Sequence, residues 1–83
     1  MLYMIELNYL PEKRDEALKY FQEHGLTHFE EGVAIEGAWV ATHEHVAYVL
    51  ATSKETAQLE KACEPLAQFG TVSMRPVTDV DQI

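Results

Sequence analysis

Cysteine is nearly absent from this chain, since Cys63 is the only one among 83 residues. A single cysteine excludes an intramolecular disulfide framework and the paired cysteines of redox or zinc motifs. It fits a reducing compartment, and residues 1–10 lack the basic start and the small-residue cleavage site of a signal peptide. We therefore expect a cytoplasmic protein that folds without disulfide bonds.

Positive charge is scarce as well. Six Lys and Arg residues stand against fourteen Asp and Glu residues, which gives a formal net charge of -8. This balance opposes binding to the phosphates of nucleic acids and to anionic membranes, so neither is expected as a partner. The sequence also lacks a Gly-rich phosphate loop, a Ser-x-x-Lys motif and a Gly-x-Ser-x-Gly motif. No recognised catalytic motif therefore assigns an activity.

The most informative stretch is a pair of apolar runs joined by a short polar turn at residues 33–52, VAIEGAWVATHEHVAYVLAT. Alternating apolar runs on either side of a polar turn predict a β-hairpin. The turn is expected to be a two-residue loop of His43 and Glu44, so that Thr42 pairs with His45. Moving outward, Val40 then pairs with Ala47 and Ala38 with Val49.

This hairpin has two apolar faces of different size. The expected bulky face collects Val33, Ile35, Gly37, Trp39, Ala41, Val46, Tyr48, Leu50 and Thr52. The expected small face collects Ala34, Glu36, Ala38, Val40, Ala47, Val49 and Ala51. A sheet with two apolar faces needs cover on both sides, and 83 residues supply helices for only one. We therefore expect a second copy of the chain to cover the bulky face.

Hydrophobic periodicity indicates elements on both sides of the hairpin. Before it, they are a strand at 2–9 and a helix at 11–24, which has an apolar stripe of Ala17, Leu18 and Phe21 and a cap at Gly25. After it, a capping box of Thr52 and Glu55 begins a second helix, whose apolar stripe is Leu59, Ala62, Cys63 and Leu66. A last strand follows at 71–77. Pro65 must kink the second helix or end it early.

The order strand, helix, strand, strand, helix, strand predicts the ferredoxin-like βαββαβ fold of the α+β class. Right-handed crossovers give a four-stranded antiparallel sheet with the first and third strands central and two helices on one face. We expect one domain over residues 1–83, with an acidic tail at 78–83.

Several short motifs of this chain resemble those of a family of small, uncharacterised bacterial domains in the dimeric α+β barrel superfamily. They are PEKRDEA at 11–17, Gly37-x-Trp39, AYVLAT at 47–52 and the acidic end after RPV at 75–77. The resemblance implies a homodimer. Relatives in the superfamily include small monooxygenases, muconolactone-isomerase-like enzymes and stress-response domains, which use a cleft between helices and sheet or inside the barrel. No catalytic residue carries over, because the family that this chain most resembles has no assigned function.

Five residues on the predicted strands are candidates for binding a ligand. They are Glu6, Asn8, Trp39, Tyr48 and Arg75. Trp39 and Tyr48 form a predicted cross-strand pair that could stack on an aromatic ligand or simply stabilise the sheet. A desolvated Glu6 could act as a general base or anchor a polar ligand, with Arg75 as counter-ion. The alternative is a structural polar contact at a strand end or across a dimer seam.

The four histidines do not predict a metal site. His24 and His28 are four residues apart, but Gly25 breaks the helix between them, and His43 and His45 belong to the hairpin turn. In this fold the loop after the first helix and the hairpin turn lie at opposite ends of the sheet. We therefore expect solvated loop histidines and no metal or other cofactor.

The sequence leaves three classes of function open. The leading prediction is a small homodimeric domain that binds a small organic ligand in the barrel cleft. The alternatives are a cofactor-independent monooxygenase- or isomerase-like enzyme that uses the same cleft, and a non-catalytic interaction or regulatory module with a filled barrel.

Overall fold

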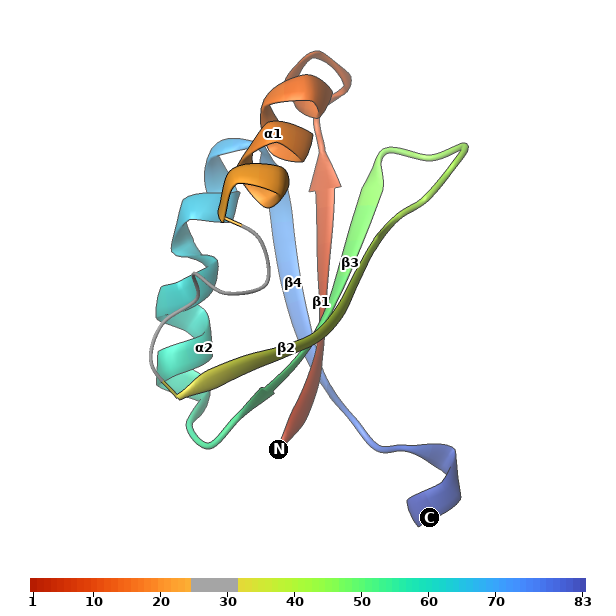
Figure 1. Ribbon diagram of the computed structural model, residues 1–83, viewed down its shortest axis with the longest axis vertical. Coiled ribbons are helices and arrows are strands. Elements are labelled where there is room, and N and C mark those ends of the chain that lie inside the picture. The colour runs from red at the N-terminus through yellow and green to blue at the C-terminus, as the bar shows by residue number, and fades with distance from the viewer. Residues whose placement is uncertain (25–31) are drawn as a thin grey trace.

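The computed structural model describes residues 1–24 and 32–83 (Figure 1). Its strands are β1 (Leu2–Tyr9), β2 (Val33–Val40), β3 (Val46–Ser53) and β4 (Gly70–Val77), and its α-helices are α1 (Arg14–His24) and α2 (Thr56–Cys63). Short 3-10 helices at Pro11–Lys13, Glu64–Gln68 and Val80–Gln82 precede α1, follow α2 and lie in the acidic tail. The predicted cap at Gly25 falls outside the described residues.

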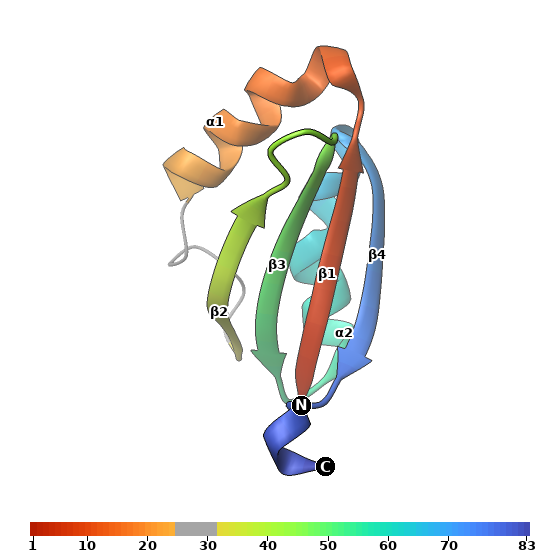
Figure 2. The same cartoon turned by 90° about the vertical axis from the view of Figure 1, so that its right-hand side faces the viewer.

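The four strands form one antiparallel sheet in the order β2-β3-β1-β4. β1 and β3 are central, and both helices lie on one side of the sheet, with α2 behind the strands in Figure 2. The predicted ferredoxin-like fold is therefore confirmed. We call the side that carries the helices the helix face and the opposite side the open face.

The core forms where the helix face of the central strands meets α2. Along β1, buried side chains alternate with more exposed ones, as the period of a strand requires. The buried set on the strands is Tyr3, Ile5, Leu7, Tyr9, Ala47, Val49 and Ala51, and α2 with the 3-10 turn after it adds Leu59, Cys63 and Leu66. The Tyr3 hydroxyl also shares a hydrogen bond of 2.8 Å with the Thr56 hydroxyl, which ties β1 to the start of α2.

The ends of α2 differ in part from the sequence prediction. Pro65 ends the α-helix as expected, because its ring excludes a further α-helical turn and the chain continues as a 3-10 helix. The predicted capping box of Thr52 and Glu55 is wrong. Thr52 belongs to β3, and Glu55 takes the N-cap position without a side-chain hydrogen bond to the helix.

A β-bulge corrects the predicted faces of the hairpin. Between Gly37 and Val40 the register is the predicted one, but between Ile35 and Gly37 it shifts by one residue. The extra residue, Glu36, reverses the facing of everything before it. Val33 and Ile35 therefore pack on the core side, whereas the Glu36 carboxylate accepts a hydrogen bond of 3.1 Å from Thr52 on the open face.

The hairpin turn is longer than predicted. The last backbone hydrogen bond across it joins the Ala41 nitrogen to the Val46 oxygen at 2.9 Å, so residues 42–45 form a four-residue loop. Thr42 and His45 consequently do not pair with each other, and the His45 carbonyl instead accepts a hydrogen bond of 3.1 Å from the Tyr9 nitrogen. A two-residue turn needs residues that accept positive φ, such as Gly or Asn, and this loop has neither.

Gly70 allows the close contact that starts β4. A Cβ atom at this position would lie 2.7 Å from the Cα atom of Tyr9 and would overlap the Asn8 carbonyl oxygen. Only glycine lets the two strand ends approach this far. None of the described helices is long and apolar enough to cross a membrane.

Candidate functional site

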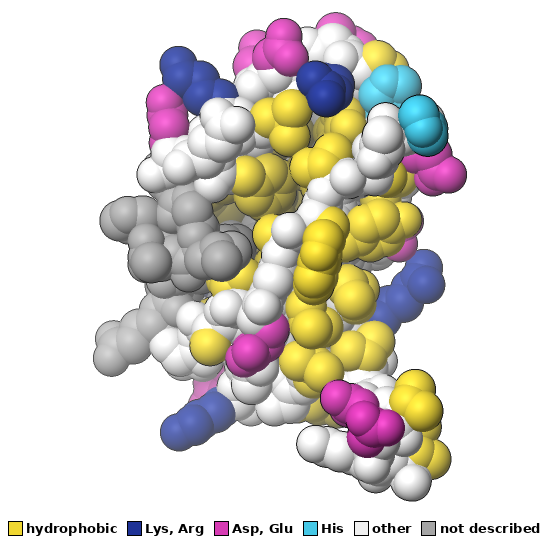
Figure 3. Space-filling view, turned by 45° about the vertical axis from the view of Figure 1, so that its right-hand side comes forward, with side chains coloured by type: hydrophobic (Ala, Val, Ile, Leu, Met, Phe, Trp, Pro, Cys, Tyr) yellow, Lys and Arg dark blue, Asp and Glu magenta, His cyan; other side chains and the backbone are white. Residues whose placement is uncertain are grey.

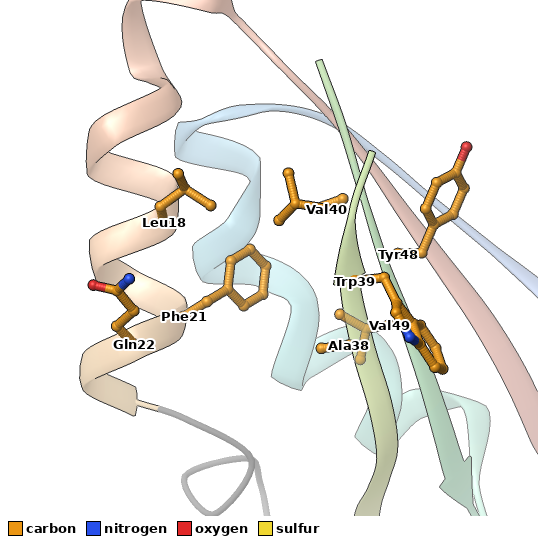
Figure 4. A pocket seen from close by; sticks show the side chains of 9 residues that line it. Leu18, Phe21, Gln22, Ala38, Trp39, Val40, Tyr48 and Val49 are labelled. Atoms are coloured by element: carbon orange, nitrogen blue, oxygen red, sulfur yellow. The ribbon is translucent and has the colours of Figure 1, made fainter. Parts of the chain in front are cut away.

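A hollow of about 220 Å³ lies between α1 and the adjacent part of the sheet. Its lining comes from three elements: Leu18, Phe21 and Gln22 of α1, Ala38, Trp39 and Val40 of β2, and Ala47, Tyr48 and Val49 of β3. We call it the α1 hollow. It lies on the side of the sheet that carries the helices, near the edge formed by β2 (Figure 4).

Small side chains on the sheet leave this space open. Ala38 and Ala47 lie on the helix face of β2 and β3 and each present a single methyl group toward α1. Among the residues of α1 whose burial is described, only Ala17 is fully buried, and Leu18 and Phe21 are half-buried. The helix therefore contacts the core through Ala17, Tyr20 and Phe21 but leaves space beside the edge of the sheet.

Most of the side chains that line the α1 hollow are apolar. In Figure 4, Leu18 and Phe21 reach from α1 toward Val40, whereas Trp39 and Tyr48 point away from α1 beyond the strands. Gln22 is the one remaining polar side chain, and the described lining contains no Asp, Glu, His, Lys or Arg. Such a space suits an apolar molecule.

The five candidate residues predicted from the sequence all lie on the open face. Trp39 is directly opposite Tyr48 in the β2 and β3 register, as predicted. The Glu6 carboxylate accepts a hydrogen bond of 3.5 Å from the Asn8 amide. Arg75 of β4 lies opposite Met4 of β1, and no described ion pair joins Arg75 to Glu6. Of the five, Trp39 and Tyr48 alone also border the α1 hollow.

The open face carries large apolar side chains on β2 and β3, among them Trp39, Tyr48 and Leu50, next to polar side chains such as those of Glu36 and Thr52. Figure 3 shows hydrophobic side chains gathered along this part of the sheet, with an acidic side chain beside them and histidine side chains at the upper margin. Trp39 is 55% exposed, and its ring lies over Gly37, where a Cβ atom would come within 2.5 Å of the ring. Glycine two residues before Trp39 therefore lets the indole lie flat on β2.

Among the side chains that the structure describes, which leave out those of His24 and His28, no three of His, Cys, Asp or Glu come together as a metal site would require. His24 ends α1, and His28 falls outside the described residues. The His45 ring contacts the edge of Tyr9 with the centroids 5.7 Å apart, which anchors one end of the hairpin loop.

Cys63 is a buried thiol, only 4% exposed, as its place on the apolar stripe of α2 predicts. Burial penalises the thiolate and raises the pKa of Cys63 from 9.0 to about 11. The thiolate is the nucleophilic form, so this cysteine is poorly reactive near neutral pH.

The pKa of Cys63 predicts slow alkylation and a loss of stability at high pH. At pH 8 the thiolate fraction is roughly a hundredfold smaller for a pKa of about 11 than for 9.0, so iodoacetamide should react at least about a hundredfold more slowly with folded than with urea-unfolded protein. The unfolded thiol loses its proton first, so the free energy of unfolding should fall as the pH rises from about 9 to 11. A Cys63→Ser control should lack this fall, and a folded-state rate within tenfold of the unfolded rate would contradict the burial of the thiol.

Comparison with known proteins supports the fold and leaves the chemistry open. A family model described as a domain of unknown function, DUF3303, matches residues 1–83. No curated protein matches the chain. An uncharacterized NIPSNAP domain protein from Burkholderia xenovorans has a similar structure, with 13% sequence identity, a TM-score of 0.59 and coverage of 95% of each chain. The family match confirms the predicted resemblance to a family of small domains of unknown function, and the structural match confirms the ferredoxin-like fold.

Proposed function

This chain belongs to the DUF3303 family of domains of unknown function, and we propose that it binds a small organic molecule in the α1 hollow. The observation that carries the proposal is the hollow itself, about 220 Å³ of space with apolar walls from three elements. Ligand sites in proteins are concave, mostly apolar and fitted with few polar groups, and this lining has that composition. The sequence analysis predicted a ligand in the barrel cleft. The present proposal instead places the ligand in the α1 hollow, on the other face of the sheet.

The proposed assembly is a homodimer that joins two open faces. The support is that the helices cover only the other side, while Trp39 is exposed and Tyr48 and Leu50 are half-buried without cover. Large exposed apolar patches on soluble proteins often mark surfaces that bind another protein. The proposed location is the cytoplasm, which the single buried thiol of Cys63 supports.

The two alternative classes receive less support. A monooxygenase- or isomerase-like reaction needs a group that moves a proton, and the described lining offers only the amide of Gln22 and the outward-pointing Tyr48 phenol. A pure interaction module would have no reason to keep an apolar hollow open beneath α1. Binding is therefore the function that this geometry supports best.

Indole is a suitable probe for the proposed site, because it is apolar and of comparable size to the hollow. We expect it to shift the NMR methyl signals of Leu18, Val40 and Val49, which line the hollow, with a dissociation constant on the order of 1 mM, equivalent to about 4 kcal/mol. The methyl signals of Leu50, on the opposite face, should not move. Unchanged Leu18 and Val40 signals at saturating indole would refute the proposed function.

A filled hollow provides the matched control. Ala38→Leu adds three carbons to a lining residue at the exposed edge strand, and it should weaken indole binding at least tenfold. Ala57→Leu makes the same change at an exposed position of α2 outside the lining and should leave binding unaltered. Equal loss of binding in both variants would mean that indole binds elsewhere.

A further inference from the structure

Strand β4 leaves one edge of the sheet open for pairing. It pairs with β1 on one side only, and in Figure 2 it forms one margin of the sheet. The Leu10 nitrogen donates a hydrogen bond of 2.9 Å to the Phe69 oxygen, and this pair continues the β1 and β4 register by one step. Hydrogen-bonded pairs recur at every second residue of an antiparallel ladder. The backbone N–H and C=O groups of Val72 and Met74 therefore point away from β1.

A groove of about 230 Å³ lies beside this edge, between β4 and the helical segment formed by α2 and the 3-10 helix after it. We call it the β4 groove. Its lining is Val72 and Met74 of β4 with Glu60, Cys63, Glu64 and Ala67 of the helical segment. A strand added to β4 would place every second side chain over this groove, because Val72 and Met74 lie on the helix face and directly opposed residues share a face.

The regular register of β4 distinguishes it from the other edge of the sheet. Strand β2 carries the bulge at Glu36, which breaks the even spacing of its backbone groups. All eight residues of β4 instead pair with β1 without a shift. Pro76 is the next residue whose backbone nitrogen points outward, and it has no N–H to donate. An added strand can therefore pair fully with Val72 and Met74 but no further, which suits a short segment.

The charge of the β4 groove indicates which segment fits. Glu60 and Glu64 are four residues apart at its rim, both are exposed, and no described ion pair includes either. Their hydrated carboxylates attract a basic side chain through water without burying it, and the net charge of -8 adds to this attraction. A β4 strand from a second copy would bring another pair of these glutamates to the same side of the sheet. Like-charge repulsion therefore disfavours self-pairing at this edge.

We infer that the β4 edge binds an extended basic segment of another protein as a fifth strand. Main-chain hydrogen bonds to Val72 and Met74 hold the segment, one apolar side chain packs in the β4 groove, and a basic side chain lies beside Glu60 or Glu64. This surface is at the opposite edge of the sheet from the α1 hollow and does not depend on ligand binding there.

The peptide acetyl-Arg-Thr-Val-Thr-Arg-amide is a suitable probe, because its arginines and valine share one face of an extended chain. We expect it to shift the amide NMR signals of Val72 and Met74, with a dissociation constant on the order of 1 mM. The signals of Ala38 and Val40, on the β2 edge, should not move. Absence of shifts at β4, or equal shifts at both edges, overturns the inference. Val72 and Met74 signals that respond to protein concentration and not to peptide would reveal a second copy at this edge, which also overturns it.

Methylation of the peptide backbone tests main-chain pairing. A methyl group on the valine nitrogen removes the N–H that faces β4 and should weaken binding at least tenfold. The same group on the nitrogen of the following threonine faces away from β4 and should weaken binding less than threefold. Equal losses would mean that the peptide lies in the β4 groove without joining the sheet, which overturns the inference.

Removal of the rim carboxylates tests the preference for a basic segment. Glu60→Gln combined with Glu64→Gln should weaken binding of the arginine peptide at least threefold and leave the Val72 and Met74 shifts at saturation unchanged. Glu12→Gln combined with Glu44→Gln removes the same net charge from exposed positions outside the groove and should weaken binding less than 1.5-fold. Equal weakening by both double variants would show that only net charge matters and would overturn the role of the rim.

Discussion

A Leu50→Glu variant is expected to sediment as a folded monomer of 9.4 kDa at concentrations where the parent protein sediments as a dimer. Leu50 lies on central strand β3, opposite Met4 of β1 and Gly37 of β2, and therefore near the middle of the open face. In the isolated chain it is only half-buried, so a carboxylate there can remain hydrated. In a dimer of two open faces the same carboxylate would be enclosed.

The expected weakening of the dimer is at least a hundredfold in its dissociation constant. Each interface would contain two of the introduced carboxylates, related by symmetry, so both the desolvation cost and the like-charge repulsion apply twice. The lone tryptophan offers a second measurement. Trp39 is 55% exposed in the single chain and would be covered on association, so its emission should shift to shorter wavelength as the concentration of the parent protein rises.

Ala57→Glu is the matched control for the dimer prediction. It adds the same charge at an exposed position of α2, on the other side of the sheet, and should leave the sedimentation unchanged. A parent protein that is monomeric at about 0.1 mM would contradict the proposed dimer. A Leu50→Glu variant that remains dimeric would show that the subunits associate through another surface.

The order of elements could be predicted from the sequence because it depends on local periodicity. Strand β1 has an apolar side chain at every second position from Tyr3 to Tyr9, and α2 has an apolar stripe that is followed by Pro65. Both features exist in the sequence without knowledge of the fold. The bulge at Glu36 could not be predicted in this way. One extra residue leaves the hydrophobic pattern of β2 plausible in either register, and the choice is made by packing Val33 and Ile35 against the core.

The α1 hollow could not be predicted because it is defined by what side chains fail to fill. The sequence showed small residues on one face of the hairpin, including Ala38 and Ala47, and an apolar stripe with Leu18 and Phe21 on the first helix. Whether these sets meet closely or leave a space depends on the position of α1 relative to β2. The candidates Glu6 and Arg75 drew attention because they interrupt apolar strands, yet they line no part of the hollow.

Two leucine truncations should distinguish the tightly packed helix from the loosely packed one. Leu59→Ala is expected to lower the free energy of unfolding by about 2–5 kcal/mol. Leu59 of α2 is 0% exposed and points into the core, and the neighbouring strands cannot easily close a cavity there. For a chain of 83 residues, whose total stability is about 4–12 kcal/mol, this is a large fraction.

Leu18→Ala makes the same chemical change but should cost less than about 1.5 kcal/mol. Leu18 already borders open space in the α1 hollow and is half-buried, so its truncation removes fewer contacts and enlarges an existing space. Urea unfolding at equal protein concentrations measures both values, since any dimer adds a concentration-dependent term. Equal losses for the two variants would mean that α1 packs against the sheet as closely as α2 does, leaving no room for a ligand.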